Sequence, residues 1–161
     1  MNHKALYVAC VLTKKAQQEL FAFMRHFVTI PANWKRIGHH MTVEFHNAEE
    51  AAQDGYFGES IKLGQPFTLI ATHYKMDTKG LALVIQRNSE LKISNECPHI
   101  TVAVAPGVAP VYSNEMLAMG DWITLPHPQM FDSYLVVVRR EVGAQPVVVE
   151  FATDVYSDPP S

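Results

Sequence analysis

One short motif, present twice, constrains the fold of this chain more than any other feature. The pattern His-apolar-Thr-apolar occurs as His40-Met41-Thr42-Val43 and again as His99-Ile100-Thr101-Val102, each within a run typical of a β-strand. Side chains two residues apart on a strand point to the same face, so each motif presents its His and Thr on one side and two apolar residues on the other. The sequence therefore predicts two half-buried strands, each with one polar face.

Two such strands side by side would gather two imidazoles and two hydroxyls around one point. An imidazole has an ordinary pKa near 6.5, so near neutral pH one ring can accept a proton while the other donates one. Hydroxyl groups can hold the non-bridging oxygens of a phosphodiester. Two imidazoles and two hydroxyls are the smallest set of side chains that acid–base catalysis on a phosphodiester needs.

The composition is typical of one globular domain. The chain has 161 residues, of which 48% are apolar and 18% are charged, which suffices for a stable core. We predict a single domain over 1–156 and a disordered tail over 157–161, which contains two prolines. Cys10 and Cys97 lie in apolar or strand-like sequence and do not resemble a secreted disulfide framework. A reducing compartment is expected, by default the cytoplasm, or the host cytoplasm if a phage encodes the chain.

The charge balance limits the partners. A net charge of −3 and a pI near 6.2 argue against a surface for long nucleic acids and favour a nucleotide or a short RNA-like substrate. No run approaches the roughly 20 apolar residues of a membrane span. His39 beside His40 could suggest a metal site, but no ligand spacing supports one, so neither metal nor cofactor is expected. A monomer is favoured.

The hydrophobic pattern mixes strands with a few helices. One helix is expected over 14–28 with Thr13 as its N-cap, another over 114–119 with Ser113 as its cap, and a short turn near 49–52. Strands are expected over 5–12, 40–46, 60–63, 67–75, 81–87, 99–105, 134–142 and 147–152. Strand–helix–strand order recurs roughly in both halves. We therefore predict an α+β fold with two antiparallel sheets, flanked by helices, that form two lobes with a central cleft.

Several further side chains are candidates for binding a substrate. Tyr7, Trp34 and Tyr74 could stack on a nucleobase, although aromatic rings of a small domain more often lie in the core. Trp34 and Tyr74 are the stronger candidates, because they stand near a loop and a strand end. Lys75 could supply local positive charge, with a solvated surface charge as the alternative.

The motifs also carry a resemblance to a known family. Two H-x-T motifs about sixty residues apart in a small α+β chain resemble the two-histidine (2H, LigT-like) phosphoesterase superfamily. Within it, the segment from Gly80-Leu81-Ala82-Leu83 to the second motif, with Gly107 to Val111 and Ser113-Asn114-Glu115 after it, is most similar to the cyclic phosphodiesterase domain of fungal and plant tRNA ligases. The resemblance implies a bilobal fold and metal-free cleavage of phosphodiesters beside a ribose hydroxyl.

The resemblance assigns roles and leaves three functions open. It implies that His40 and His99 form the general acid–base pair, that Thr42 and Thr101 bind phosphate oxygens, and that Ser113 lies near the substrate. One function is the opening of 2′,3′-cyclic phosphate ends of RNA. Another is the degradation of cyclic di- or trinucleotide second messengers, as in the phage anti-CBASS nucleases of the superfamily. The third is a nucleotide-binding module without turnover.

Overall fold

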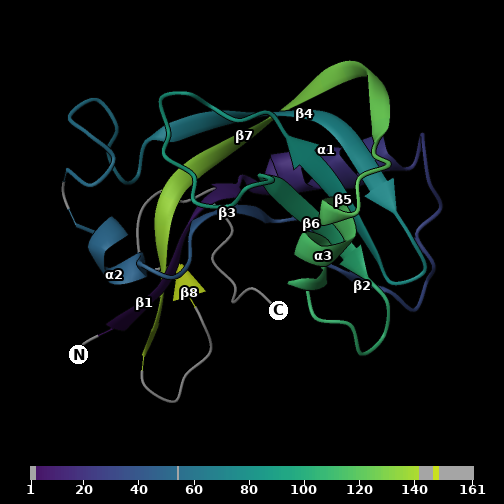
Figure 1. The fold of residues 1–161 in the computed structure, drawn as a ribbon, viewed down its shortest axis with the longest axis horizontal. Helices are drawn as coiled ribbons and strands as arrows, with labels where there is room; N and C mark the ends of the chain where they lie inside the picture. The colour runs from purple at the N-terminus through teal and green to yellow at the C-terminus, as the bar shows by residue number, and fades with distance from the viewer. Residues whose placement is uncertain (1–2, 54, 142–146, 149–161) are drawn as a thin grey trace.

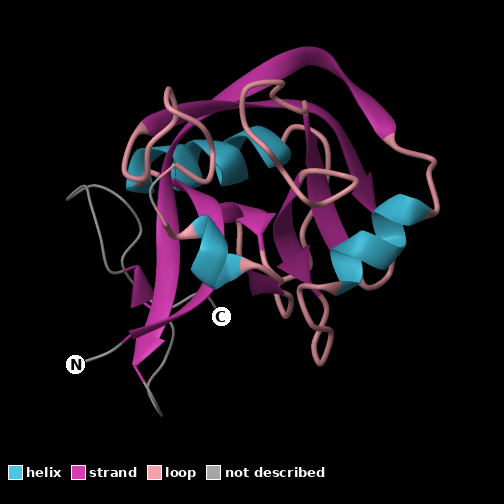
Figure 2. Cartoon of the chain, turned by 60° about the vertical axis from the view of Figure 1, so that its left-hand side comes forward, coloured by secondary structure: helices cyan, strands magenta, loops and turns pink. Residues whose placement is uncertain are grey.

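The computed structural model describes residues 3–53, 55–141 and 147–148, and the strands in these ranges belong to one antiparallel sheet (Figure 1). The strands are β1 (His3–Leu12), β2 (Lys35–Arg36), β3 (His40–Glu44), β4 (Pro66–Met76), β5 (Gly80–Ile85), β6 (His99–Val104), β7 (Ile123–Glu141) and β8 (Val147–Val148). The helices are α1 (Lys14–Met24), α2 (Ala48–Ala51) and α3 (Tyr112–Ala118). Figure 2 shows these helices apart from one another, around the strands. In the described part, no helix is long and apolar enough to cross a membrane.

The sheet closes on itself. Its strand order is β1-β3-β6-β5-β4-β7, and β7 pairs again with β1, so six antiparallel strands form a small barrel. β2 pairs with β6, and β8 pairs with β7. The predicted α+β fold, with two sheets flanked by helices and a cleft between two lobes, is therefore wrong.

The closure depends on β7, a single 19-residue strand that pairs with β4 and then with β1. The predicted strand 134–142 covers only its second half. Pro126 and Pro128 fall between the Thr124–His73 pair and the Gln129–Ala71 pair, where the register shifts. Proline has no N–H to donate to a neighbouring strand, and both prolines lie within the stretch where the register shifts. Regular pairing with β4 is therefore lost only there and is kept on either side. The strand therefore continues past the prolines and joins what we expected to be two sheets.

The barrel interior is an apolar core. One cross-strand row runs through Cys10, Met41, Ile100 and Leu83, all at most 1% exposed. The buried face of α1, which consists of Ala16, Leu20 and Met24, packs against the same core. The helix predicted over 14–28 ends at Met24. Complete burial raises the pKa of the Cys10 thiol to about 12, so it stays protonated in this core.

Other element boundaries differ in detail. The segment 60–63 is not a strand, and only Val147–Val148 of the predicted strand 147–152 lies in the described part. The predicted tail 157–161 lies outside the described residues. α3 begins at Tyr112 after Val111, so Ser113 is not its cap. The predicted turn near 49–52 corresponds to α2.

The N-cap of α1 agrees with the prediction and can be tested by mutation. Thr13 Oγ1 accepts a hydrogen bond from the backbone N–H of Ala16 at 3.0 Å. Lys14 and Lys15 stand in the first turn, where positive charge opposes the helix dipole, so the cap matters more. We expect Thr13→Ala to lower the free energy of unfolding by about 1 kcal/mol in urea titrations. The exposed Gln18→Ala is the control, and equal stability of the two variants would contradict the prediction.

Candidate functional site

The two motifs lie on neighbouring strands, β3 and β6 (Figure 1). Met41 pairs with Ile100 in antiparallel register, which places His40 opposite Thr101 and Thr42 opposite His99. Met41 and Ile100 point into the barrel, so the side chains before and after them point outward. The structure therefore brings both imidazoles and both hydroxyls together on the outer face of the barrel.

Apolar side chains border this polar group on both sides. On the β1 side, Ala9 and Val11 pair with Thr42 and His40 and belong to a small cluster, here called the β1/β7 cluster. Its members are Ala9, Val11, Val136 and Val138, with Tyr7 and Tyr134 packed against them. On the β5 side is the α3 cluster of Ala82, Val84, Met116 and Leu117, with Cys97 and Tyr112 packed against it. The four motif side chains therefore occupy a polar strip between two apolar clusters.

His99 is oriented by a backbone hydrogen bond. Its Nδ1–H donates to the carbonyl oxygen of Cys97 at 2.8 Å. A carbonyl can only accept, so the proton of neutral His99 lies on Nδ1, and Nε2 is unprotonated. Burial lowers the pKa of His99 below its ordinary 6.5, although the hydrogen bond to Cys97 acts in the opposite direction.

The ring of His40 contacts two other rings. One face stacks on Tyr7, with ring centroids 5.3 Å apart and planes at 27°. Its Nδ1 edge meets the Nδ1 edge of His39: the two Nδ1 atoms are 2.6 Å apart, the centroids are 4.7 Å apart and the planes differ by 17°, so these two rings lie side by side. Burial lowers the pKa of His40 well below 6.5, and the neighbouring imidazoles of His39 and His99 lower it further. His40 is therefore neutral at pH 7 in the unliganded protein.

The hydroxyl of Thr101 is fixed by a second hydroxyl. Thr101 Oγ1 and Ser113 Oγ are 2.8 Å apart, and Thr101 Oγ1 also lies 3.4 Å from the Pro110 carbonyl oxygen. Ser113 is only 1% exposed. Ser113, which we expected near the substrate, thus contacts the Thr101 hydroxyl and is itself covered from solvent.

The other expected contacts lie apart from one another. Tyr7 borders the motif residues through its stack on His40. Trp34 and Tyr74 are buried in the interior core, and Tyr74 packs against Phe27. The Lys75 ammonium donates to the carbonyl of Gly120 at 2.6 Å, beyond the end of α3. The structure therefore does not bring Trp34, Tyr74 or Lys75 to the motifs.

His39 is the contact that sequence reasoning missed, because we considered it only as a metal ligand. Neighbouring residues on a strand point to opposite faces, so the pattern gave no reason to pair it with His40. His39 precedes β3, however, and alternation does not apply to it. In the described residues, no group of three His, Cys, Asp or Glu side chains is placed to hold a metal ion.

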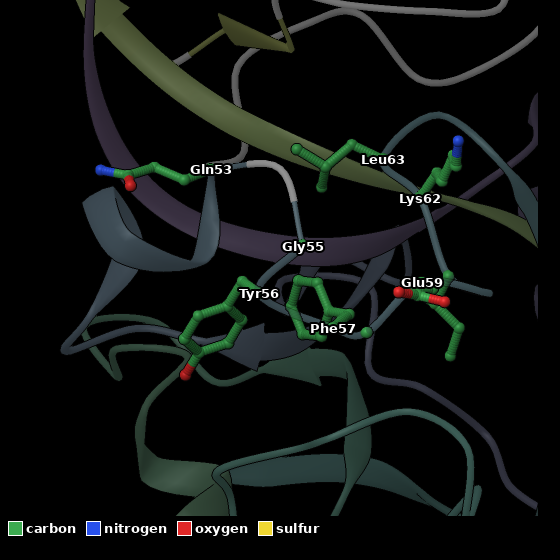
Figure 3. A pocket seen from close by; sticks show the side chains of 9 residues that line it. Gln53, Gly55, Tyr56, Phe57, Glu59, Lys62 and Leu63 are labelled. Carbon is green, nitrogen blue, oxygen red and sulfur yellow. The ribbon is translucent and has the colours of Figure 1, made fainter.

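A surface pocket lies elsewhere, in the loop that follows α2 (Figure 3). It has a volume of about 350 Å³ and is lined by Gln53, Gly55, Tyr56, Phe57, Gly58, Glu59, Ile61, Lys62 and Leu63. None of the motif residues lines it. The candidate site is therefore defined by the two motif strands and not by this pocket.

The chain is a 2H phosphoesterase-type domain, and its two His-x-Thr strands lie side by side in the sheet. The chain belongs to the family of the fungal tRNA ligase phosphodiesterase domain, which it matches over residues 3–146. This confirms the resemblance found in the sequence. No curated protein matches the chain. Membership of the family supports a cyclic phosphodiesterase activity and an RNA-like substrate.

Proposed function

We propose that this chain hydrolyses 2′,3′-cyclic phosphates at RNA ends, with His40 and His99 as a general acid–base pair. The Met41–Ile100 register carries the proposal, since it sets the two imidazoles diagonally across one point on the barrel surface. Each imidazole has its Nδ1 within hydrogen-bond distance of a partner, which directs Nε2 to the substrate.

The free cysteines Cys10 and Cys97 favour a reducing compartment such as the cytoplasm.

The reaction needs one proton to be taken up and one to be given. The neutral imidazole removes a proton from water, and the water oxygen forms a new bond to phosphorus. The bond from phosphorus to one ribose oxygen breaks, and the protonated imidazole gives its proton to that oxygen. The product is a ribose with one hydroxyl and one phosphate monoester. Thr42 and Thr101 hold the non-bridging oxygens, where negative charge accumulates in the transition state.

The lowered histidine pKa values suit one of these roles directly. A neutral imidazole at pH 7 is ready to act as the base. The acid must be protonated, and the bound phosphodiester supplies the reason, because a nearby negative charge favours the charged form of an imidazole. We infer that binding of the anionic substrate raises the pKa of the imidazole that acts as the acid, so that this imidazole becomes protonated.

The proposal is tested by incubating purified, EDTA-treated protein with nucleoside 2′,3′-cyclic phosphates, a short RNA ending in a cyclic phosphate, and a panel of cyclic dinucleotides. We expect the first two to be converted to phosphate monoesters, with the products separated by chromatography. Conversion of cyclic dinucleotides alone would replace the proposed substrate with a second messenger. No turnover of any of them, with binding retained, would favour a nucleotide-binding module and overturn the proposal.

A further inference from the structure

The strongest unexplained feature of the site is the buried imidazole beside His40. His39 is 4% exposed, and its Nδ1 lies 2.6 Å from the Nδ1 of His40. The two rings are nearly parallel, with centroids 4.7 Å apart. An N···N distance this short requires a proton between the two atoms, since two lone pairs would repel. One of the two rings therefore donates and the other accepts.

The backbone holds His39 in this place. Its carbonyl oxygen accepts from the N–H of Leu12 at 2.9 Å, and the N–H of the preceding Gly38 donates to the backbone carbonyl oxygen of Thr101 at 3.0 Å. Gly38 has φ +52°, and a Cβ there would lie 2.7 Å from the ring of Phe21. This turn, which favours glycine, leads directly into β3. It lets two successive histidines approach each other, which regular strand geometry would prevent.

The direction of the hydrogen bond follows from the chemistry that His40 must perform. If the shared proton sits on His40 Nδ1, then His40 can gain and lose a proton at Nε2 without breaking the contact. If it sits on His39 Nδ1, a protonated His40 would have two N–H groups pointing at each other. Burial, with Lys35 as a smaller cause, lowers the pKa of His39 to about 4, so His39 remains neutral and able to accept at neutral pH.

We propose that His39 is a positioning residue, whose Nδ1 accepts the Nδ1–H of His40 and thereby holds the Nε2 of His40 toward the reacting phosphate. This inference rests on the proposed function, because the orientation of Nε2 matters for activity only if His40 acts on a phosphodiester. It gives His40 the same arrangement that the Cys97 carbonyl gives His99. Loss of the hydrogen-bond partner of a metal-ligating histidine costs about 10–100-fold, whereas loss of a charged partner that also stabilises the imidazolium costs about 10⁴-fold. We expect the lower range for His39, because it is neutral.

The first test needs no variant at His39. In ¹⁵N NMR spectra of the wild-type protein at pH 7.5, we expect His40 to carry its proton on Nδ1 and to show an unprotonated Nε2. The His40 signals are assigned by their loss in His40→Gln. A His40 ring with its proton on Nε2 would overturn the proposal. Because this measurement does not depend on turnover, it stands even if the substrate proposed above is wrong.

Two variants then separate positioning from packing. His39→Phe keeps an aromatic ring that fills the buried space but has no nitrogen, whereas His39→Asn keeps a short polar side chain that can accept a hydrogen bond. With a 2′,3′-cyclic phosphate as substrate, we expect kcat of His39→Phe to fall about 10–100-fold with KM changed less than about threefold. His39→Asn is expected to recover most of that loss. Wild-type kcat in His39→Phe, or an equal loss in both variants, would overturn the proposal.

Discussion

Replacing His99 by alanine is expected to lower kcat for a 2′,3′-cyclic phosphate by 10²–10⁴-fold, and His40→Ala is expected to do the same, because each change removes one of the two proton carriers. The double variant should lose little more than either single variant, since the two imidazoles act as a unit. Steady-state kinetics of the three proteins measure this directly.

A matched control is available on α1's C-terminal side. His26 is exposed, so His26→Ala makes the same chemical change away from the motifs and should leave kcat unchanged. Thermal unfolding of each variant checks that the barrel is retained. If His40→Ala and His99→Ala both stayed within about tenfold of the wild type, the paired-histidine mechanism would be wrong.

The second large effect concerns stability at acidic pH. The pKa of His39 is lowered to about 4 in the folded protein, chiefly by burial, while its value in the unfolded chain is near 6.5. Above pH 6.5 His39 is unprotonated in both the folded and the unfolded protein, so it does not change the free energy of unfolding. As the pH falls from 6.5 toward 4, the unfolded chain takes up the proton first and is stabilised. The free energy of unfolding is therefore expected to drop by about 3 kcal/mol from this residue alone.

Urea titrations between pH 7.5 and pH 4, followed by tryptophan fluorescence, measure this loss. Trp34 is 9% exposed and reports on the core. His39→Asn lacks the titrating group, so its stability should fall less over the same range. Carboxylates such as Glu44 titrate in both proteins and cancel in the comparison. Parallel pH dependence of wild type and variant would show that His39 does not carry the effect.

The sequence predicts the local features of this fold well. The alternation in both motifs correctly separates outward His and Thr from inward Met41 and Ile100, because a strand has a fixed period of two. The N-cap at Thr13 follows from the hydroxyl chemistry of helix starts. Both features depend only on residues adjacent along the chain, so no knowledge of the tertiary structure is needed.

Features that depend on contacts between residues far apart in the chain could not be predicted from the sequence. Closure of the barrel requires β7 to pair with both β4 and β1, and no local pattern states which strands a long strand will join. Ser113 looks like a helix cap or a substrate contact, yet its hydroxyl binds Thr101 because α3 packs beside β6's neighbour β5. Trp34 and Tyr74 stand near a loop and a strand end in the sequence but fold into the core.

The antiparallel Met41–Ile100 pair also gives the site a local twofold symmetry. An axis between these two residues maps His40 onto His99 and Thr42 onto Thr101, so the motifs alone present the same face to a phosphodiester in either of two opposite orientations. The surroundings break this equivalence, with Tyr7 and His39 beside one histidine and the Cys97 carbonyl beside the other. In the proposed reaction, we therefore expect residues outside the motifs to decide in which orientation the substrate binds, and hence which ribose oxygen keeps the phosphate.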